Sequence, residues 1–143
     1  MKKSHAGFSL VEVLVFTTIL GLFFVAALTI TTFNLKNMKI QEHKILATRY
    51  AEEAIEWLKE EKENDWSDFI THTGTNYCLN SLAWTSGVCG TYSLGTPGFF
   101  KRDLLITNSG SPVDKVETTM TVSWEDMGTV LSVPIKTVFR ILE

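Results

Sequence analysis

The stretch Phe8-Ser9-Leu10-Val11-Glu12-Val13-Leu14-Val15 opens the most apolar part of this 143-residue chain. No charged residue occurs from Val13 to Phe33. A helix of that length spans about 30 Å, which is the thickness of the hydrocarbon core of a bilayer. The stretch therefore predicts a membrane-spanning helix, and the residues after it must supply any soluble core.

The residues before this stretch indicate how the apolar segment is retained. A secretory signal peptide places its apolar region before a cleavage site of small residues. Here the order is reversed, because Ala6 and Gly7 precede the apolar segment and follow the basic pair Lys2-Lys3. Cleavage after Gly7 would leave the hydrophobic helix on the mature protein, which argues against an ordinary secreted enzyme.

The same residues carry a family resemblance. Lys2-Lys3, Gly7 and the stretch from Phe8 to Glu12 resemble the leader and mature start of type IV pilins and type II secretion pseudopilins. The resemblance implies that a prepilin peptidase cleaves between Gly7 and Phe8 and methylates the new amine of Phe8. The close similarity covers about the first quarter of the chain.

The resemblance also implies a domain organisation, a location and partners. Residues 1–7 would be the cleaved leader, residues 8–34 a transmembrane and filament-core helix, and residues 35–143 an extracytoplasmic pilin-like head. The chain would cross the cytoplasmic membrane once, with its N-terminus in the cytoplasm, and later enter a periplasmic or cell-surface filament. Lysines on both sides of the apolar segment leave the positive-inside rule undecided. The implied partners are other pilin subunits, the prepilin peptidase, the inner-membrane assembly platform and, before assembly, membrane lipid.

Glu12 is the candidate residue for subunit assembly. An ionised carboxylate costs several kcal/mol to bury in an apolar helix, and intramembrane acids are by default functional. The residues from Val13 to Phe33 offer Glu12 no partner. The new amine of Phe8, on the same or preferably a neighbouring subunit, would supply one. The alternative is that Glu12 lies at the depth of the lipid headgroups and is hydrated.

The second part of the predicted helix is amphipathic. Apolar residues recur at spacings of three and four and form one stripe: Ala47, Tyr50, Ala51, Ala54, Ile55 and Leu58. Glutamates occupy the opposite side, and they belong to an acidic run from Glu52 to Asp68 that we interpret as a solvated face. No Gly or Pro occurs between Leu22 and Thr73. The pattern predicts a continuous helix over about residues 8–64 whose second half lies against a sheet.

A turn-rich segment follows at residues 65–98 and contains both cysteines, Cys78 and Cys89. Because the resemblance places this segment outside the cytoplasm, we expect the two cysteines to form a disulfide. The segment shows no pattern of regular structure. Asp65 and Asp68 are candidate calcium ligands, although a solvated helix end explains them better.

The C-terminal part alternates with a period of two, which is typical of half-buried strands. Strands are predicted over residues 104–107, 116–125 and 131–141, with turns at 108–112 and 126–128. Pro134 has no N–H to donate, so it indicates an edge strand or a bulge. The predicted fold class is α+β, with a long N-terminal helix packed on a small antiparallel sheet.

Composition and motifs argue against nucleic-acid binding, metal binding and catalysis. The net charge is −3, and only Lys101 and Arg102 offer adjacent basic residues near the turn-rich segment, so nucleic acid is a disfavoured partner that stays open. The three histidines, the cysteines and the acids lack metal-ligand spacing, and there is no CxxC or phosphate-binding loop. We therefore expect no catalytic residue, metal or cofactor.

The sequence therefore favours a structural subunit of a type IV pilus-like filament. The sequence Glu12-Val13-Leu14-Val15 resembles that of minor pilins and minor pseudopilins more than that of major subunits. One alternative is a pseudopilin of a type II secretion or DNA-uptake machine. A second alternative is a membrane-anchored binding domain that does not polymerise.

Overall fold

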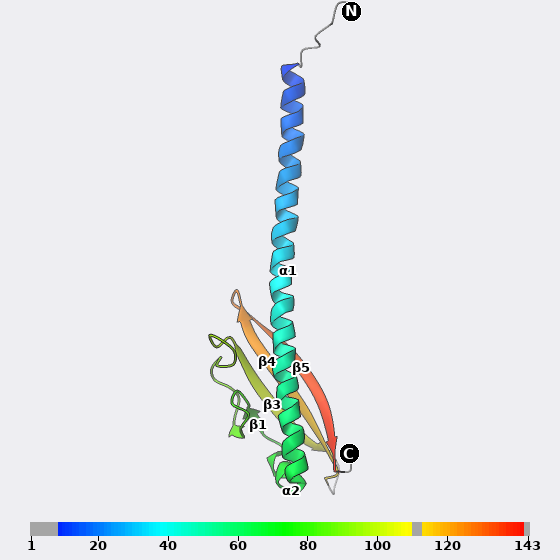
Figure 1. Cartoon of the computed structure of the whole chain (residues 1–143), viewed down its shortest axis with the longest axis vertical. Coiled ribbons are helices and arrows are strands. Elements are labelled where there is room, and N and C mark those ends of the chain that lie inside the picture. The colour runs from blue at the N-terminus through cyan, green and yellow to red at the C-terminus, as the bar shows by residue number, and fades with distance from the viewer. Residues whose placement is uncertain (1–8, 110–112, 142–143) are drawn as a thin grey trace, which may run out of the picture. The chain divides into compact units, whose positions relative to one another are not determined.

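A computed structural model describes residues 9–109 and 113–141 of the chain. Its first and longest element is helix α1, Leu10–Asn64 (Figure 1), which confirms the predicted continuous helix. The helix passes through Gly21 without a break. The described chain divides into two compact units, one ending at Gln41 and the other beginning at Glu42. The second unit is the head, and it contains the latter part of α1 and the whole sheet.

Within the head, α1 packs against the sheet through small side chains. Ala47, Ala51, Ala54 and Leu58 are completely buried, as the apolar stripe predicts. Three alanines on one face let the helix backbone lie close to the facing side chains, and Leu58 belongs to the same hydrophobic core. The buried stripe and the inward faces of the strands form one hydrophobic core. The predicted packing of an amphipathic helix on a sheet is confirmed.

The sheet has five antiparallel strands in the order β2-β1-β3-β4-β5. Its bounds are β1 Asn76–Cys78, β2 Thr85–Ser86, β3 Phe100–Ser109, β4 Lys115–Asp126 and β5 Thr129–Arg140. The three long strands are those predicted from the alternation. The two short strands extend the sheet beside β3 and were not predicted.

The expectation that residues 65–98 lack regular structure is wrong. This segment contains helix α2, Trp66–Phe69, the 3-10 turn η1, Ile70–His72, and both short strands. Elements of two to four residues are too short to show a period of 2 or 3.6, so the sequence pattern could not reveal them. β1 pairs with β3 and β2 pairs with β1, while Phe69 of α2 and Tyr77 of β1 belong to the hydrophobic core.

Asp65 has a structural role at the start of α2. Its carboxylate accepts hydrogen bonds from the backbone N–H groups of Ser67, at 2.8 Å, and Asp68, at 3.1 Å. These N–H groups lack partners inside the helix, and an aspartate at this position satisfies them. The cap accounts for Asp65 without a bound ion.

The β4–β5 hairpin follows the predicted alternation. Val116, Thr118, Met120, Val122 and Trp124 of β4 are all buried on the core side. A two-residue turn, Met127-Gly128, joins the strands, and both residues have positive φ values of 49° and 76°. Pro134 lies in β5, which is an edge strand, opposite Thr121. Of the two alternatives predicted from the proline, an edge strand or a bulge, the structure shows the edge strand.

Candidate functional site

The first part of α1 exposes a long apolar surface. Its large exposed side chains include Leu10, Val11, Leu14, Phe16, Ile19, Leu22, Phe23, Phe24, Leu28, Ile30 and Phe33. Within the described residues, α1 is one helix long and apolar enough to cross a membrane. Contiguous exposed apolar surface of this extent marks contact with lipid or with protein.

Threonine hydroxyls within this surface are satisfied by the helix itself. Thr17 and Thr18 both donate to the carbonyl oxygen of Leu14, at 3.0 and 2.7 Å. Further along, Thr29 donates to Val25, and Thr31 and Thr32 bond in the same way to carbonyls one turn back. A hydroxyl that has an internal partner does not need water, so these threonines are compatible with lipid or a dry helix contact.

Glu12 lies in the first turn of α1 and its side chain is exposed. The first turn has backbone N–H groups without helical partners and the positive end of the helix dipole, and both stabilise a carboxylate. Ser9 immediately precedes the helix, and Ser9 and Glu12 have the Ser-x-x-Glu spacing of a capping box. This spacing would allow Glu12 to cap the helix locally, and it is a sequence signal that the prediction for Glu12 did not include.

The N-terminal sequence contains a family signature. Residues 2–28 match the prokaryotic N-terminal methylation motif. The chain carries the signature of type IV pilin-like prepilins. No curated protein matched the chain, and no solved structure matched it. The motif covers Gly7 and Phe8, which lie outside the described residues, so cleavage and methylation there remain predictions.

The signature and the exposed apolar helix together point to membrane anchoring and to a structural protein of the pilin-like class. A long N-terminal helix followed by a small antiparallel sheet is the pilin-like layout expected from the sequence. Assembly with other pilin-like subunits and processing by a prepilin peptidase follow from the motif.

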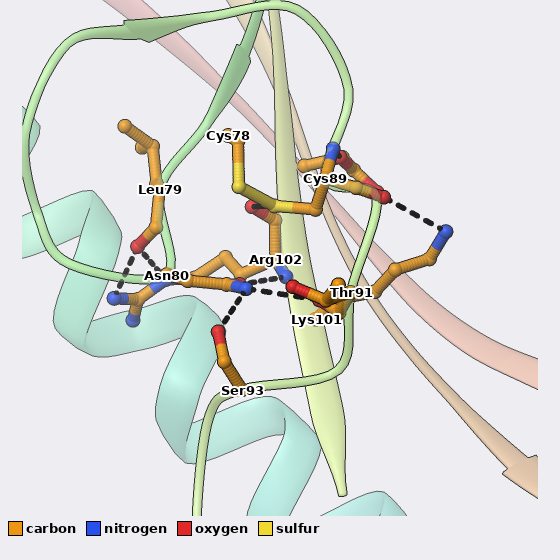
Figure 2. The surroundings of a disulfide bond; sticks show 9 residues. Cys78, Leu79, Asn80, Cys89, Thr91, Ser93, Lys101 and Arg102 are labelled. Atoms are coloured by element: carbon orange, nitrogen blue, oxygen red, sulfur yellow. Dashed lines mark hydrogen bonds between the residues drawn. A yellow bond between two sulfur atoms is a disulfide. The ribbon is translucent and has the colours of Figure 1, made fainter. Parts of the chain in front are cut away.

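The pilin-like head contains the predicted disulfide between Cys78 and Cys89 (Figure 2). Cys78 ends β1, and the two Cα atoms are 4.7 Å apart. The backbone N–H of Cys89 also donates to the carboxylate of Asp103 at 2.6 Å, which fixes the closing end of the loop on β3. The covalent bond and this hydrogen bond hold the same short segment against the sheet.

Arg102 joins the disulfide loop to the helix and is only 1% exposed. Its Nε and Nη2 atoms donate to the carbonyl oxygen of Leu79, at 3.0 and 2.7 Å (Figure 2). Its Nη1 atom donates to the backbone carbonyl of Tyr50 and, at 2.9 Å, to the Glu53 carboxylate. Both latter partners belong to α1, so one side chain spans the helix, β3 and the loop.

Burial and charge act in opposite directions on this arginine. Desolvation lowers the pKa of Arg102, and the hydrogen bond and charge of Glu53 raise it in part. The Glu53 side chain remains 52% exposed, so water screens the ion pair on that side. The two carbonyls therefore matter more than Glu53 for holding the guanidinium in place.

These contacts correct the expectation that Arg102 is available to nucleic acid. The guanidinium is buried and hydrogen-bonded to protein atoms of the head, so only Lys101 of that basic pair reaches the surface. The strand predicted from the sequence begins at Leu104 and so leaves out Arg102, whereas β3 begins at Phe100. Extending the alternation back from Leu104 would have placed Arg102 on the core side.

The acidic run of α1 is mostly solvated, as predicted, but two of its carboxylates have structural partners. Glu53 contacts Arg102, and Glu61 accepts a hydrogen bond at 2.9 Å from the indole Nε1 of Trp84. Trp84 stacks on His72 with ring centroids 3.9 Å apart. Among residues 9–109 and 113–141, no three His, Cys, Asp or Glu side chains come together as possible metal ligands.

Proposed function

We propose that this chain is a minor subunit of a type IV pilus-like filament. A prepilin peptidase cleaves it between Gly7 and Phe8, the new amine of Phe8 is methylated, and the first part of α1 packs in the filament core. Before assembly the chain crosses the cytoplasmic membrane with its N-terminus in the cytoplasm. The head, within residues 35–143, then lies on the outer side.

The exposed apolar helix bearing one carboxylate in its first turn is the observation that carries this proposal. Between Ser9 and Leu35 the only charged residue is Glu12. Helices that pack side by side bury the apolar surface that lipid covers in the isolated subunit. The Glu12 carboxylate gains a partner when an amine at Phe8 of a neighbouring subunit comes close, and that charge pairing favours the assembled state.

Two substitutions separate this role of Glu12 from local capping. Glutamine serves as well as glutamate in a capping box, so Glu12→Gln keeps the cap and removes the charge. Glu12→Ala removes both. We expect both variants to be expressed, cleaved and retained in the membrane, and both to be lost from filaments. Glu52→Gln is the control, because Glu52 is an exposed carboxylate on the solvated part of the same helix.

The measurement combines N-terminal mass with fractionation of cell envelopes before and after shearing. A mature chain that begins with methyl-Phe8 and appears in sheared fibres at low abundance relative to another subunit supports a minor pilin. The same processed chain in a fraction that shear does not release favours a pseudopilin of a secretion or DNA-uptake machine. An intact Met1, together with indifference to Glu12→Ala, would instead identify an anchored domain that does not polymerise.

A further inference from the structure

The head contains a pocket that the assembly function does not use. It has a volume of about 300 Å³ and lies where the β4–β5 turn meets the loop before β3. The residues that line it are Tyr92, Gly98, Phe99, Glu125, Met127 and Gly128. The hollow is open to solvent, and its lining brings aromatic residues together with polar groups, which is the combination that small-ligand sites use.

The lining residues combine two aromatic residues, Tyr92 and Phe99, with one residue that has a formal charge, Glu125. Met127 adds a residue with a polarisable thioether. Within the described residues, Glu125 has no ion-pair partner. An unpaired carboxylate beside two aromatic rings attracts a cation, because the faces of such rings carry negative partial charge.

Met127 is an unusual residue for its position. Its φ is 49°, in the left-handed region, and its side chain is 81% exposed. Two-residue hairpin turns with two positive φ values favour Asn, Asp or Gly at this point, and Met gains nothing there from the backbone. A strained and exposed thioether at the rim of an aromatic pocket is consistent with contact to an apolar group of a ligand.

Lys101 shows that one of these rings already accepts a cation. Its Nζ atom lies 5.5 Å from the centroid of the Tyr92 ring. The same ammonium donates to the carbonyl of Cys89 at 3.4 Å (Figure 2). This anchor holds Lys101 on the loop and leaves Glu125 without an internal counter-ion.

We propose that this pocket binds a quaternary ammonium group. A primary ammonium is strongly hydrated and needs several acceptors to replace its water, whereas the pocket offers one carboxylate. A quaternary ammonium has no N–H to satisfy and interacts through ring faces, thioether contact and net charge. Phe99 and Tyr92 supply the ring faces, Met127 covers the methyl groups, and Glu125 balances the charge.

The test is a titration of the full-length chain in maltoside micelles with choline chloride at constant ionic strength. The backbone amide signals of Gly98 and Gly128, two glycines that line the pocket, report on binding in two-dimensional NMR spectra. We expect saturable binding in the millimolar range. The neutral isostere 3,3-dimethylbutan-1-ol and the primary ammonium of N-acetyl-lysine amide should each bind at least about five-fold more weakly.

Three variants make the assignment specific. Glu125→Gln should weaken choline binding about five-fold, since it removes an exposed charge pair. Lys101→Gln should strengthen binding, because it removes a like charge near Tyr92, and a misfolded head could not produce that gain. Glu117→Gln is the control, because Glu117 lies on the same face of β4 as Glu125 but outside the pocket, and it should leave binding unchanged.

Each contrary result overturns the proposal. Equal affinity for the alcohol would show that the charge is irrelevant, and tighter binding of the lysine amide would reject the quaternary group. An unchanged affinity in Glu125→Gln, or shifts that do not saturate at Gly98 and Gly128, would place any binding elsewhere. The assay needs no filament, so its failure is independent of the outcome for Glu12.

Discussion

Arg102→Met tests how strongly the buried guanidinium stabilises the pilin-like head. The substitution keeps much of the apolar stem but removes the four hydrogen bonds that the side chain donates. The carbonyl of Leu79 then loses both of its side-chain donors in a buried site. An unmet buried acceptor costs about 1–3 kcal/mol, and a lost hydrogen bond to a charged group about 1.5–3 kcal/mol.

An opposing effect reduces this loss. Arg102 is desolvated, as the lowering of its pKa by burial indicates, and replacement by methionine removes that penalty. The Tyr50 carbonyl lies in the middle of α1, where helical bonding offers it another donor. We therefore expect a net loss of about 3 kcal/mol in the free energy of unfolding of the head.

Glu53→Gln is the matched control for this prediction. The Glu53 side chain is 52% exposed, and Arg102 keeps its carbonyl partners when the charge is removed. Exposed ion pairs contribute about 0.2–1 kcal/mol, so we expect a change at the lower end of this range. Arg102→Lys should fall between the two variants, because one ammonium cannot reach the loop and the helix with the same geometry.

The assay is urea unfolding of the full chain in micelles, followed by near-ultraviolet circular dichroism of the head tryptophans. With a slope of about 1.5 kcal/mol per molar urea, a loss of 3 kcal/mol lowers the midpoint by about 2 M. Hydrogen exchange should show the largest loss of protection between Leu79 and Cys89. If Arg102→Met shifts the midpoint no more than Glu53→Gln, the carbonyl contacts do not stabilise the head as argued.

Three further predictions concern the head. Replacing Cys78 and Cys89 by serine should cost about 3 kcal/mol, because the disulfide closes a short loop in the unfolded chain, and urea unfolding with and without reductant would measure it. The hydrogen bond from Lys115, and then the charge of Lys115, lower the pKa of Glu117 below its ordinary value. The contact therefore stabilises the fold at pH values above the pKa that Glu117 has in the unfolded chain, and this stabilisation is lost as the pH falls through the pKa of Glu117 in the folded chain. NMR titration should show the pKa of Glu117 rising in Lys115→Met. Leu58→Ala should destabilise the head by about 2–5 kcal/mol in the same urea assay, since Leu58 is completely buried and leaves a cavity.

The elements with a sustained period could be predicted from the sequence. Spacings of three and four between Ala47 and Leu58 correctly place one face of α1 on the core, and alternation correctly gives β4 and β5. In each case burial repeats often enough to leave a pattern in the residue types. The missing N–H of Pro134 limits it to an edge strand or a bulge, and β5 is an edge strand.

The parts that could not be predicted depend on long-range contacts. Arg102 is buried because carbonyls of Tyr50 and Leu79, both distant in the sequence, converge on it. The alternation extended back from Leu104 gives only the inward face of Arg102, and it cannot show which distant carbonyls receive the guanidinium. The pocket likewise lies between a loop at Tyr92 and a turn at Met127, and the sequence of neither segment predicts that the two come together.

Glu12 illustrates how one residue can satisfy a local and an intermolecular requirement. In an isolated subunit the first turn of α1 already stabilises the carboxylate through unpaired N–H groups and the helix dipole, by about 0.3–1 kcal/mol at an exposed site. Only the further gain from a partner amine can favour assembly, so that gain is smaller than the full cost of burying a charge. Filaments that form as well with Glu12→Gln as with glutamate would show that capping suffices. Loss of filaments in both variants, with processing intact, would assign the difference to the charge.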